Sequence, residues 1–378
     1  MSVSYGVLFY GFSVLITDKG AGGEFSSTVL SSAYGGAVLS AGAAAPLVGR
    51  VADRFGVRWI IAGGSVAAGF GIALFARSTL DWHALAVWWL VLGPAMAMTL
   101  YEPAYVAIQQ WYAPPDRPRA IAVLTLAAGL SGAIFIPATG FLLDEFGWRN
   151  AATVLAALFV LGAGAALLAV PRGTATAPDR VRDSATGWRS QLSAFRRPRL
   201  MVFTLGAILA YGTLEANVIH RIARFEDAGL SVTVVTYWAA LSGFLTLPGR
   251  FLLPMLGGRY RAARLLAGVL LVLSAATAFM IDGSESWQMV AYFWLFGLVF
   301  GAALPLRAVV MSQWHPTARG FGTLLGLQAA MIAVARAGGP PLVGLLRELG
   351  GYALPMMLLT FAFALAAVLV VLSESLHD

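Results

Sequence analysis

The chain contains no cysteine, a single lysine and few charges, and each shortage excludes a class of protein. Without cysteine there are no disulfide bonds, thiolate metal sites or cysteine nucleophiles. Charged residues make up 11% of the 378 residues and hydrophobic residues 59%, whereas soluble domains have about 25% charged and about 45–50% apolar residues. So little charge cannot cover a water-facing surface, which excludes a soluble enzyme, and the high hydrophobicity excludes disorder. The sequence predicts a protein that is surrounded mainly by lipid.

Motifs for ATP hydrolysis and for catalysis are also missing. The lysine, Lys19, follows Asp18 instead of the glycine that a phosphate-binding Walker A loop requires. There is no Gly-x-Ser-x-Gly motif of serine hydrolases, and the four histidines are too scattered for an HExxH zinc motif. We therefore expect no enzymatic activity, no cofactor and no metal ion, and any transport must draw on an ion or substrate gradient.

Hydropathy divides the chain into twelve apolar segments. A transmembrane helix needs about 20 mostly apolar residues, because it rises 1.5 Å per residue across a hydrocarbon core of roughly 30 Å. The segments are Val3–Thr17, Ser27–Val48, Trp59–Phe75, Ala84–Ala107, Arg119–Leu142, Ala151–Val170, Leu200–His220, Val232–Leu253, Ala262–Ile281, Trp287–Met311, Phe321–Leu342 and Ala353–Leu372. They predict an all-α polytopic membrane protein with twelve transmembrane helices.

The positive charge is almost entirely arginine and is unevenly distributed between the connections. If both termini face the cytoplasm, sixteen of the 25 Lys and Arg residues fall in inside connections and six in outside ones. This bias is typical of membrane proteins, and it explains the net charge of +7 without a nucleic-acid partner. We expect a multi-pass protein of the cell (inner) membrane with both termini in the cytoplasm. The segment Val3–Thr17 lacks the basic region and cleavage site of a signal peptide, so we interpret it as a mature helix.

Short similarities separated by about 200 residues indicate an internal repeat. Pro46–Arg50 ends the second segment and Leu247–Arg250 ends the eighth, while Gln110–Trp111 and Gln313–Trp314 end the fourth and the tenth. Two six-helix halves in parallel repeat are a known plan of membrane transporters. The expected division is an N-terminal bundle of residues 1–170, a cytoplasmic linker of residues 171–199 and a C-terminal bundle of residues 200–378.

The connection after the second segment carries a motif. Residues 49–58 read G-R-V-A-D-R-F-G-V-R and resemble the signature of the major facilitator superfamily, Gly-x-x-x-Asp-Arg/Lys-x-Gly-x-Arg/Lys. Its glycines allow a tight turn and close helix contact, and Asp53 can lie at a neighbouring helix N-terminus and pair with arginine, as a breakable gate. The expected gating residues are Gly49, Asp53, Arg54, Gly56 and Arg58. In the second half, Leu253 stands in place of Asp53.

Three further features resemble the monocarboxylate porter and oxalate–formate antiporter branches of that superfamily. They are Gly147-Trp148-Arg149 after the fifth segment, Ser4–Val7 in the first and Arg250 in the eighth. The resemblance implies a monomeric secondary transporter that carries a small, monocarboxylate-like organic anion by alternating access, with protons as the coupling ion. It also implies that segments 1, 4, 7 and 10 line a central cavity.

Ionisable residues within the predicted segments are the strongest indication of function. The free energy of inserting an Arg, Lys or Asp side chain at the bilayer centre is unfavourable by about 2.5–3.5 kcal/mol. Such side chains therefore face a protein interior or a wet cavity. The expected substrate-binding residues are Arg250, Arg307, Arg336, Tyr10, Tyr105 and Tyr211. The expected proton-coupling residues are Glu102 and Glu215. A structural ion pair is the alternative for each charged residue, and Arg250 has a second alternative as part of a loop.

Two questions stay open at this point. The repeat puts Glu102 and Arg307 at nearly matching positions, so they are expected to face each other, either as a proton-coupling pair or as a permanent ion pair. The function has two alternatives: a proton-driven antiporter that exports drugs or metabolites, and a membrane sensor that transports nothing. Three arginines against two glutamates favour an anionic substrate.

Overall fold

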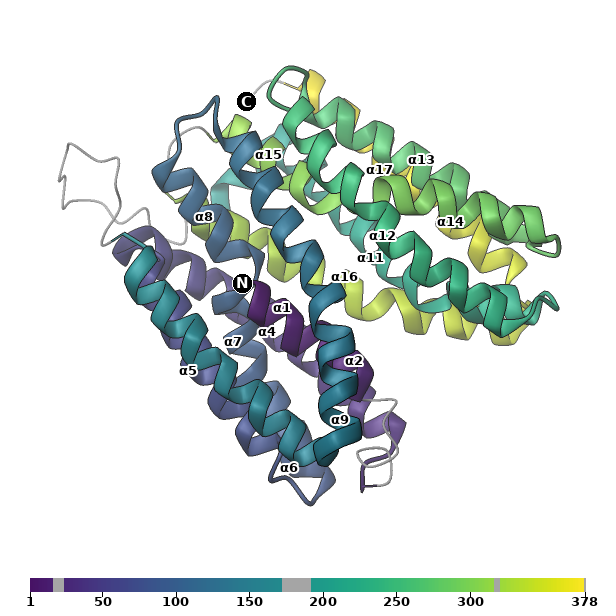
Figure 1. Cartoon of the computed structure of the whole chain (residues 1–378). Helices are drawn as coiled ribbons and strands as arrows, with labels where there is room; N and C mark the ends of the chain where they lie inside the picture. The colour runs from purple at the N-terminus through teal and green to yellow at the C-terminus, as the bar shows by residue number, and fades with distance from the viewer. Residues whose placement is uncertain (16–23, 172–191, 316–319, 377–378) are drawn as a thin grey trace. The chain divides into compact units, whose positions relative to one another are not determined.

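The computed structural model describes residues 1–15, 24–171, 192–315 and 320–376, and every regular element in them is a helix (Figure 1). The first part of the chain forms α1 (Ser2–Tyr5), the π-helix η1 (Gly6–Gly11), α2 (Phe12–Leu15), α4 (Ser27–Phe55), α5 (Arg58–Phe75), α6 (Asp81–Val87), the π-helix η2 (Trp88–Leu92), α7 (Gly93–Thr99), α8 (Tyr101–Trp111) and α9 (Arg117–Ala169). The rest forms α11 (Pro198–Asp227), α12 (Val232–Leu256), α13 (Ala262–Asp282), α14 (Ser286–Phe300), α15 (Ala303–Trp314), α16 (Phe321–Gly350) and α17 (Ala353–Ser375).

The twelve predicted segments are confirmed within the described residues. Ten helical stretches are long and apolar enough to cross a membrane, and Ser2–Leu15 is a shorter apolar stretch. One of the ten, α9, has 53 residues and is divided by Gly147, whose backbone is not helical (φ 70°, ψ 165°). A positive φ suits glycine, which has no Cβ atom. Counted this way, the described helices provide eleven spans, and Ser2–Leu15 is the described part of the twelfth predicted segment, Val3–Thr17.

The helices form two compact units. Unit 1 contains Met1–Ala113, Ala127–Ala185 and His315–Ala333, and unit 2 contains Pro114–Leu126, Thr186–Trp314 and Val334–Asp378. The chain therefore changes unit inside α9 and again inside α16. Most of the predicted linker, residues 172–191, lies outside the described residues, so the division at residues 170 and 200 stays a prediction.

Unit 1 packs around a cluster of aromatic rings. The ring centroids of Phe12 and Trp88 are 4.0 Å apart, and Phe75 lies 5.8 Å from Trp88. Phe25 and Trp148 extend the cluster to the start of α4 and to the second half of α9. All five side chains are at most 5% exposed. Large aromatic rings bury much surface per residue, so this cluster is the main packing centre of the unit.

Unit 2 is crossed by a chain of buried polar side chains. Asn217 of α11 donates to the hydroxyl oxygen of Thr277 on α13 at 2.9 Å and accepts a hydrogen bond from Tyr292 on α14 at 2.5 Å. All three residues are fully buried, and buried polar groups require such partners. Arg224 adds bonds from its guanidinium to the last carbonyl groups of α13. These contacts hold α11, α13 and α14 together.

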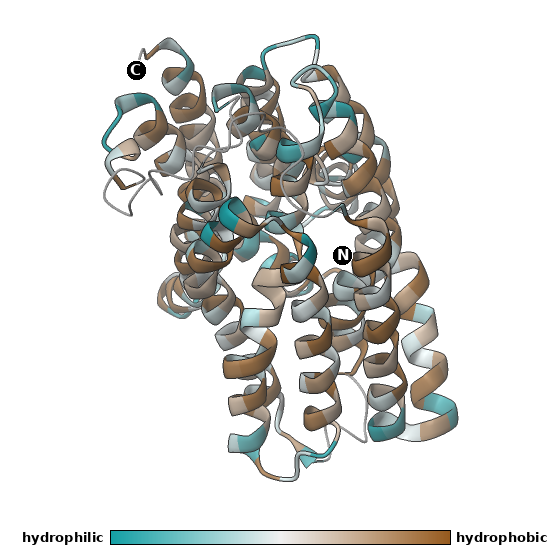
Figure 2. Ribbon diagram, turned by 90° about the vertical axis from the view of Figure 1, so that its left-hand side faces the viewer, coloured by the Kyte–Doolittle hydropathy of each residue, from teal (hydrophilic) through white to brown (hydrophobic). Residues whose placement is uncertain are grey.

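The outer surface of the helices is apolar. Large hydrophobic side chains are exposed along the long helices, among them Leu168 at 89% and Leu349 at 77%. Figure 2 shows hydrophobic colour along most of the helical length and hydrophilic colour concentrated in the connections. Contiguous exposed apolar surface of this extent does not occur on soluble monomers. The chain is a multi-pass membrane protein.

Candidate transport site

The end of α4 crosses the start of α16 at a pair of glycines in unit 1. A Cβ atom on Gly49 would lie 2.0 Å from the carbonyl oxygen of Gly322, and a Cβ atom on Gly322 would lie 2.6 Å from that of Gly49. One turn further along α16, a Cβ atom on Gly326 would lie 2.3 Å from the carbonyl oxygen of Ala45. Only glycine permits backbones to approach this closely. The first glycine of the motif is therefore a helix-crossing residue.

Asp53 lies at the N-terminus of α16. Its carboxylate accepts hydrogen bonds from the backbone N–H groups of Gly322 and Thr323, both at 2.8 Å, and from the Thr323 hydroxyl at 2.7 Å. The first N–H groups of a helix have no partner within the helix, and a negative charge is favourable there. The position at a helix N-terminus was expected. An arginine partner was also expected, but among the described residues no ion pair of Asp53 is found.

The remaining motif residues shape the connection between α4 and α5. Gly56 ends α4 with a φ of 79°, a left-handed value that favours glycine. Arg58 donates to the carbonyl oxygen of Leu167 near the end of α9. The Arg54 side chain is exposed, and its guanidinium lies 5.2 Å from the ring centroid of Phe55. Gly56 and Arg58 thus have structural contacts, whereas Arg54 faces outward.

Two glutamines that marked the repeat make matching contacts. Gln110 donates to the carbonyl oxygen of Ala52 at 3.1 Å, near the end of α4. Gln313 donates to the carbonyl oxygen of Gly257 at 2.7 Å, just after α12. The Ala52 carbonyl oxygen also accepts from the backbone N–H of Gly56 at 3.0 Å, so Gln110 adds a second bond there. Each glutamine thus ties its own helix to the end of α4 or α12. The internal repeat pointed to these residues but not to their role.

The fourth transmembrane segment is broken next to Glu102. It was expected as one helix, but Leu100 has φ −87° and ψ −147° and separates α7 from α8. Glu102 therefore stands in the first turn of α8, half-buried. A carboxylate is stabilised at a helix N-terminus. Glu102 belongs to unit 1 and Arg307 to unit 2, so their expected pairing stays a prediction.

The tyrosines of unit 1 lie in aromatic contacts. Tyr105 is 2% exposed and stacks on Tyr101 with ring centroids 5.4 Å apart and an interplanar angle of 6°. The Tyr5 ring lies against Tyr101 at an interplanar angle of 49°, with ring centroids 4.7 Å apart. Tyr10 lies in the π-helix η1, a geometry that is frequent at functional sites, and its ring faces Gly132 of α9. Tyr10 and Tyr105 are thus held by neighbours on other helices.

An ion pair joins α11 to α16 within unit 2. Arg336 donates from Nε to Oε2 of Glu215 at 2.9 Å, and its Nη2 lies 2.9 Å from the same oxygen. The two side chains are 33% and 25% exposed, respectively. The pair is therefore partly desolvated and still accessible to a solute. The sequence predicted both residues as site residues, but not as partners of each other.

A second arginine faces α11 one turn before this pair. Arg307 of α15 is 2% exposed, and its guanidinium lies 5.6 Å from the ring centroid of Tyr211. Tyr211 and Glu215 are four residues apart and therefore share one face of α11. Cation–π contacts of this kind stabilise a buried guanidinium. Unit 2 thus brings together four of the predicted residues: Tyr211, Glu215, Arg307 and Arg336.

Arg250 lies inside α12, so the alternative that it belongs to a loop is wrong. The helix continues to Leu256, and Arg250 is half-buried. Its carbonyl oxygen is 3.5 Å from the hydroxyl of Thr125 at the start of α9. Its Cβ atom would be 3.1 Å from a Cβ atom on Gly301. Arg250 therefore packs from α12 against the connection of α14 to α15.

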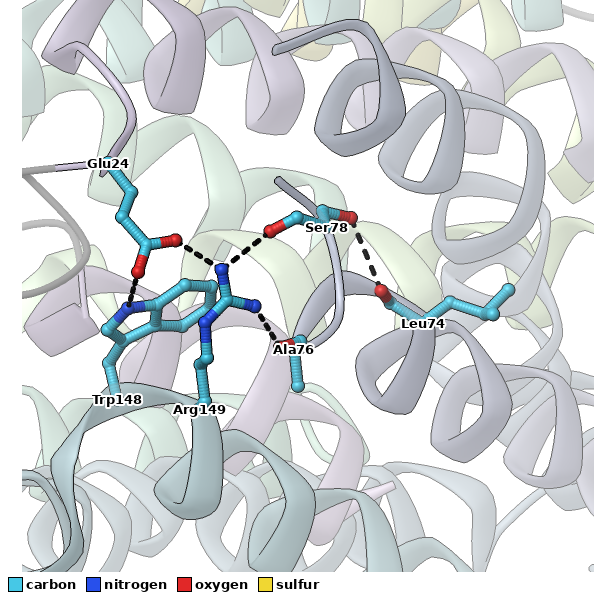
Figure 3. Close-up of polar contacts among 6 residues, drawn as sticks. All are labelled: Glu24, Leu74, Ala76, Ser78, Trp148 and Arg149. Atoms are coloured by element: carbon cyan, nitrogen blue, oxygen red, sulfur yellow. Dashed lines mark hydrogen bonds and ion pairs between the residues drawn. The ribbon is translucent and has the colours of Figure 1, made fainter. Parts of the chain in front are cut away.

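A polar cluster at the other end of unit 1 involves a residue that sequence reasoning missed (Figure 3). Arg149 donates to the carbonyl oxygen of Ala76 at 2.5 Å and to that of Ser78 at 3.0 Å, and it forms an ion pair with Glu24. The indole of Trp148 also donates to Glu24, at 3.3 Å. The Gly-Trp-Arg motif thus ties the α5–α6 connection and the start of α4 to α9. The motif indicated Arg149, but no pattern indicated Glu24.

The chain is similar to several transporters of known sequence. It is 26% identical over 318 residues to the MFS transporter asaE of Aspergillus flavus, covering 81% of this chain and 68% of the relative. It is 29% identical over 333 residues to monocarboxylate transporter 11 of Homo sapiens, covering 81% of this chain and 66% of the relative. The chain thus spans about two thirds of the length of these two relatives.

Solved structures share the fold at low sequence identity. The fucose:proton symporter FucP of E. coli superimposes with a TM-score of 0.80 at 12% identity, covering 98% of this chain and 97% of that one. The human organic anion transporter MFSD10 gives a TM-score of 0.68 at 19% identity, with 97% and 89% covered. The sequence profile of the Major Facilitator Superfamily matches residues 1–281. Together with the twelve-span helical fold and the Gly49–Arg58 motif, this establishes that the chain belongs to the major facilitator superfamily of membrane transporters.

Proposed function

We propose that this protein is a secondary transporter that carries a small organic anion of the monocarboxylate type together with protons. The observation that carries the proposal is the face of α11, where Tyr211 and Glu215 each contact an arginine from another helix. Relatives named monocarboxylate transporters support this substrate class. The protein acts as a monomer in the cell (inner) membrane, with both termini in the cytoplasm.

The arginines recognise the carboxylate of the substrate. A guanidinium presents a planar fork of donors that matches a carboxylate in a bidentate manner. The Nε and Nη2 atoms of Arg336 already bind a carboxylate oxygen, Oε2 of Glu215. A substrate carboxylate would bind the guanidinium through the same kind of hydrogen bond. Arg250 and Arg307 are the further candidates, and Tyr10, Tyr105 and Tyr211 supply hydroxyl groups.

Glu215 connects substrate binding to proton binding. While ionised, it occupies Arg336, and a protonated carboxyl attracts a guanidinium far less strongly. Protonation of Glu215 therefore makes Arg336 available to the substrate, so that proton and anion bind together. Glu102, at the N-terminus of α8, is the second proton-coupling candidate, either with Arg307 as a coupling pair or in a permanent ion pair.

The Asp53 contact is the proposed gate on the cytoplasmic side. Its three hydrogen bonds and the Gly49–Gly322 crossing hold the end of α4 on the start of α16. Alternating access requires that this contact opens once in each cycle. Hydrogen bonds to a charged group contribute about 1.5–3 kcal/mol each, which is strong enough to hold a closed state and weak enough to break. Arg54 and Arg58 flank the gate.

Uptake into proteoliposomes tests the function. We expect saturable uptake of radiolabelled lactate, stimulated by an inward proton gradient. Arg336→Lys keeps the charge but loses the planar fork, so kcat/KM should fall about tenfold or more. Arg264→Lys is the matched control, because Arg264 is exposed and pairs with Glu374 away from the α11 face.

Three results would contradict the proposal. If lysine variants of both Arg336 and Arg250 transport lactate normally, the arginines do not recognise a carboxylate. If no monocarboxylate is taken up, and an organic cation is exported in exchange for protons instead, the protein is an efflux antiporter. Absence of any transport would favour the sensor alternative.

A further inference from the structure

His220 is a titratable residue that the proposed mechanism does not use. It lies on α11, beyond Glu215, and is half-buried. Its Nε2 atom is 3.0 Å from the carbonyl oxygen of Pro340 on α16, and its Nδ1 atom is 3.2 Å from the hydroxyl of Tyr352, which precedes α17. Both ring nitrogens therefore have partners, which come from two other elements.

These partners allow two protonation states of the imidazole. A carbonyl oxygen only accepts, so Nε2 carries a hydrogen in both states. A hydroxyl donates or accepts, so Nδ1 of a neutral ring accepts from Tyr352, and Nδ1 of a charged ring donates to it. Burial raises the pKa of Tyr352, so its hydroxyl keeps its hydrogen. A proton can thus be added to His220 without the loss of either hydrogen bond.

The contact with α16 lies at a weak point of that helix. Pro340 and Pro341 are both inside α16, and proline has no N–H group to continue the helical hydrogen bonds. The carbonyl groups that lose a helical donor are those four residues earlier, of Arg336 and Ala337. His220 bonds the carbonyl oxygen of Pro340 itself, beside this interruption. A hydrogen bond from a charged donor is roughly twice as strong as a neutral one. Protonation of His220 therefore strengthens the contact between α11 and α16 next to the proline pair.

The Arg336–Glu215 pair is the neighbouring contact between the same two helices. Glu215 and His220 are five residues apart, about 7.5 Å along the helix axis. The backbones of the two helices also touch beside the ion pair, because a Cβ atom on Gly339 would lie 2.4 Å from the carbonyl oxygen of Gly212 and 3.5 Å from the Cβ atom of Ala216. His220 and the ion pair therefore belong to one continuous contact between α11 and α16.

Several charged groups lie around Tyr352, the partner of His220. They are Arg224 and Asp227 on α11 and Arg347 on α16, and Glu215 with its partner Arg336 is the neighbouring charged pair between α11 and α16. Arg347 pairs with Asp227 at 3.1 Å and lies 4.7 Å from the Tyr352 ring centroid. Removal of one carboxylate from this set changes how readily the imidazole takes up a proton.

We infer that His220 is a second proton-binding site of the transporter, at the end of α11 assigned to the outside, and that it makes substrate exchange depend on external pH. The inference rests on the proposed function, because it requires a cycle in which the Arg336–Glu215 pair opens. Histidine suits this role, since its charge changes in the physiological pH range.

Equilibrium exchange of radiolabelled lactate tests the inference, because exchange needs no net proton movement. Internal pH is held constant and external pH is varied between about 5.5 and 7.5, the range in which imidazole titrates. The wild type should change its rate about threefold or more across this range, as one titrating group would produce. His220→Gln keeps a donor for Pro340 and an acceptor for Tyr352 but cannot titrate, so its rate ratio should be clearly smaller than that of the wild type, with only the dependence that Glu215 contributes left. His83→Gln on α6 is the control and should behave as the wild type.

A second measurement covers a variant that folds but does not transport. The chain has four histidines, so histidine-selective isotope labelling gives few NMR signals, and the one missing in His220→Gln identifies His220. We expect this signal to titrate between about pH 5 and 8 and its midpoint to shift in Glu215→Gln.

Each result has one meaning. A His220→Gln variant with the pH profile of the wild type, or a signal that does not titrate in that range, overturns the inference. If lactate is not transported while the signal titrates and responds to Glu215→Gln, the proposed substrate is wrong and the second proton site stands.

Discussion

The ends of α4 and α12 occupy corresponding places in the two halves of the chain, and both depend on a glycine. A Cβ atom on Gly49 would lie 2.0 Å from the carbonyl oxygen of Gly322 on α16, and one on Gly249 would lie 1.9 Å from that of Leu298 on α14. In both places the backbones touch, so no larger residue fits. The glycine has the same packing role in both halves, although Gly49 packs against α16 and Gly249 packs against α14.

The two ends differ in the side chain that lies one turn beyond the glycine. Asp53 binds the start of α16 with three hydrogen bonds, whereas the second half has the apolar Leu253 in α12. The start of α9 near α12 carries Thr125, whose hydroxyl bonds the carbonyl oxygens of Ile121 and Ala122 in its own helix at 2.9 and 3.2 Å and lies 3.5 Å from that of Arg250 on α12. The end of α4 thus has three strong hydrogen bonds to α16, whereas the end of α12 has one long contact with Thr125. This difference is the reason for proposing the gate at the end of α4.

Substitution of the two glycines should have the largest effect. Gly49→Ala and Gly249→Ala force a Cβ atom into a backbone carbonyl, and overpacking costs about 1–3 kcal/mol. Both variants should lower the unfolding temperature measured in detergent. Gly35→Ala in α4 and Gly243→Ala in α12 are matched controls, because an added Cβ atom meets nothing within 4 Å at either position. If Gly249→Ala is as stable as Gly243→Ala, the two crossings are not equivalent.

Asp53→Asn should have the next largest effect, on transport and not on folding. The amide loses the charge at the α16 N-terminus, and a charged hydrogen bond exceeds a neutral one by about 1 kcal/mol or more. Exchange should fall several-fold, and a single cysteine at the buried Ala45 should react faster with a thiol reagent because the contact opens more often. Leu253→Asn serves as the control and should change neither measurement. Normal exchange by Asp53→Asn would reduce Asp53 to an ordinary turn residue.

Thr323→Val should give a smaller effect in the same direction. It removes one of the three hydrogen bonds of Asp53 and leaves the two from backbone N–H groups. The loss of one bond to a charged acceptor is about 1.5 kcal/mol, so the reactivity of the Ala45 cysteine should rise less than in Asp53→Asn. Thr125→Val, which removes a hydroxyl bonded within its own helix, should leave it unchanged. Equal effects of the two valine variants would mean that the hydrogen bonds of Asp53 are not what distinguishes the halves.

The sequence predicted the spans because hydropathy is a property of the chain alone. It did not predict the break at Leu100, because hydropathy is uniform across that segment. Pro103, in the first turn of α8, has no N–H group for the carbonyl oxygen of Thr99 and favours a break there. The division of α9 at Gly147 agrees with the two separate segments Arg119–Leu142 and Ala151–Val170 that the sequence predicted. Hydropathy therefore locates the spans but not a break within one span.

The candidate site was predicted residue by residue but not contact by contact. Glu215 and Arg336 were both selected because charge is costly in a membrane. Their pairing depends on how α11 and α16 pack, which neither repeat spacing nor composition contains. The same limit hid Thr323 as a partner of Asp53 and Glu24 as a partner of Arg149, since residues distant in sequence meet only in the folded chain.

The central claim is that protonation of Glu215 releases Arg336, which then binds the carboxylate of the substrate. One comparison tests this claim most directly. Proton-driven accumulation and counterflow exchange of radiolabelled lactate are measured in proteoliposomes for Glu215→Gln, with Glu102→Gln beside it. Glutamine cannot release a proton, so Glu215→Gln should lose accumulation and retain counterflow, which needs no net proton movement. If Glu215→Gln still accumulates lactate against its gradient, the claim is wrong, and coupling belongs to Glu102 or to another group.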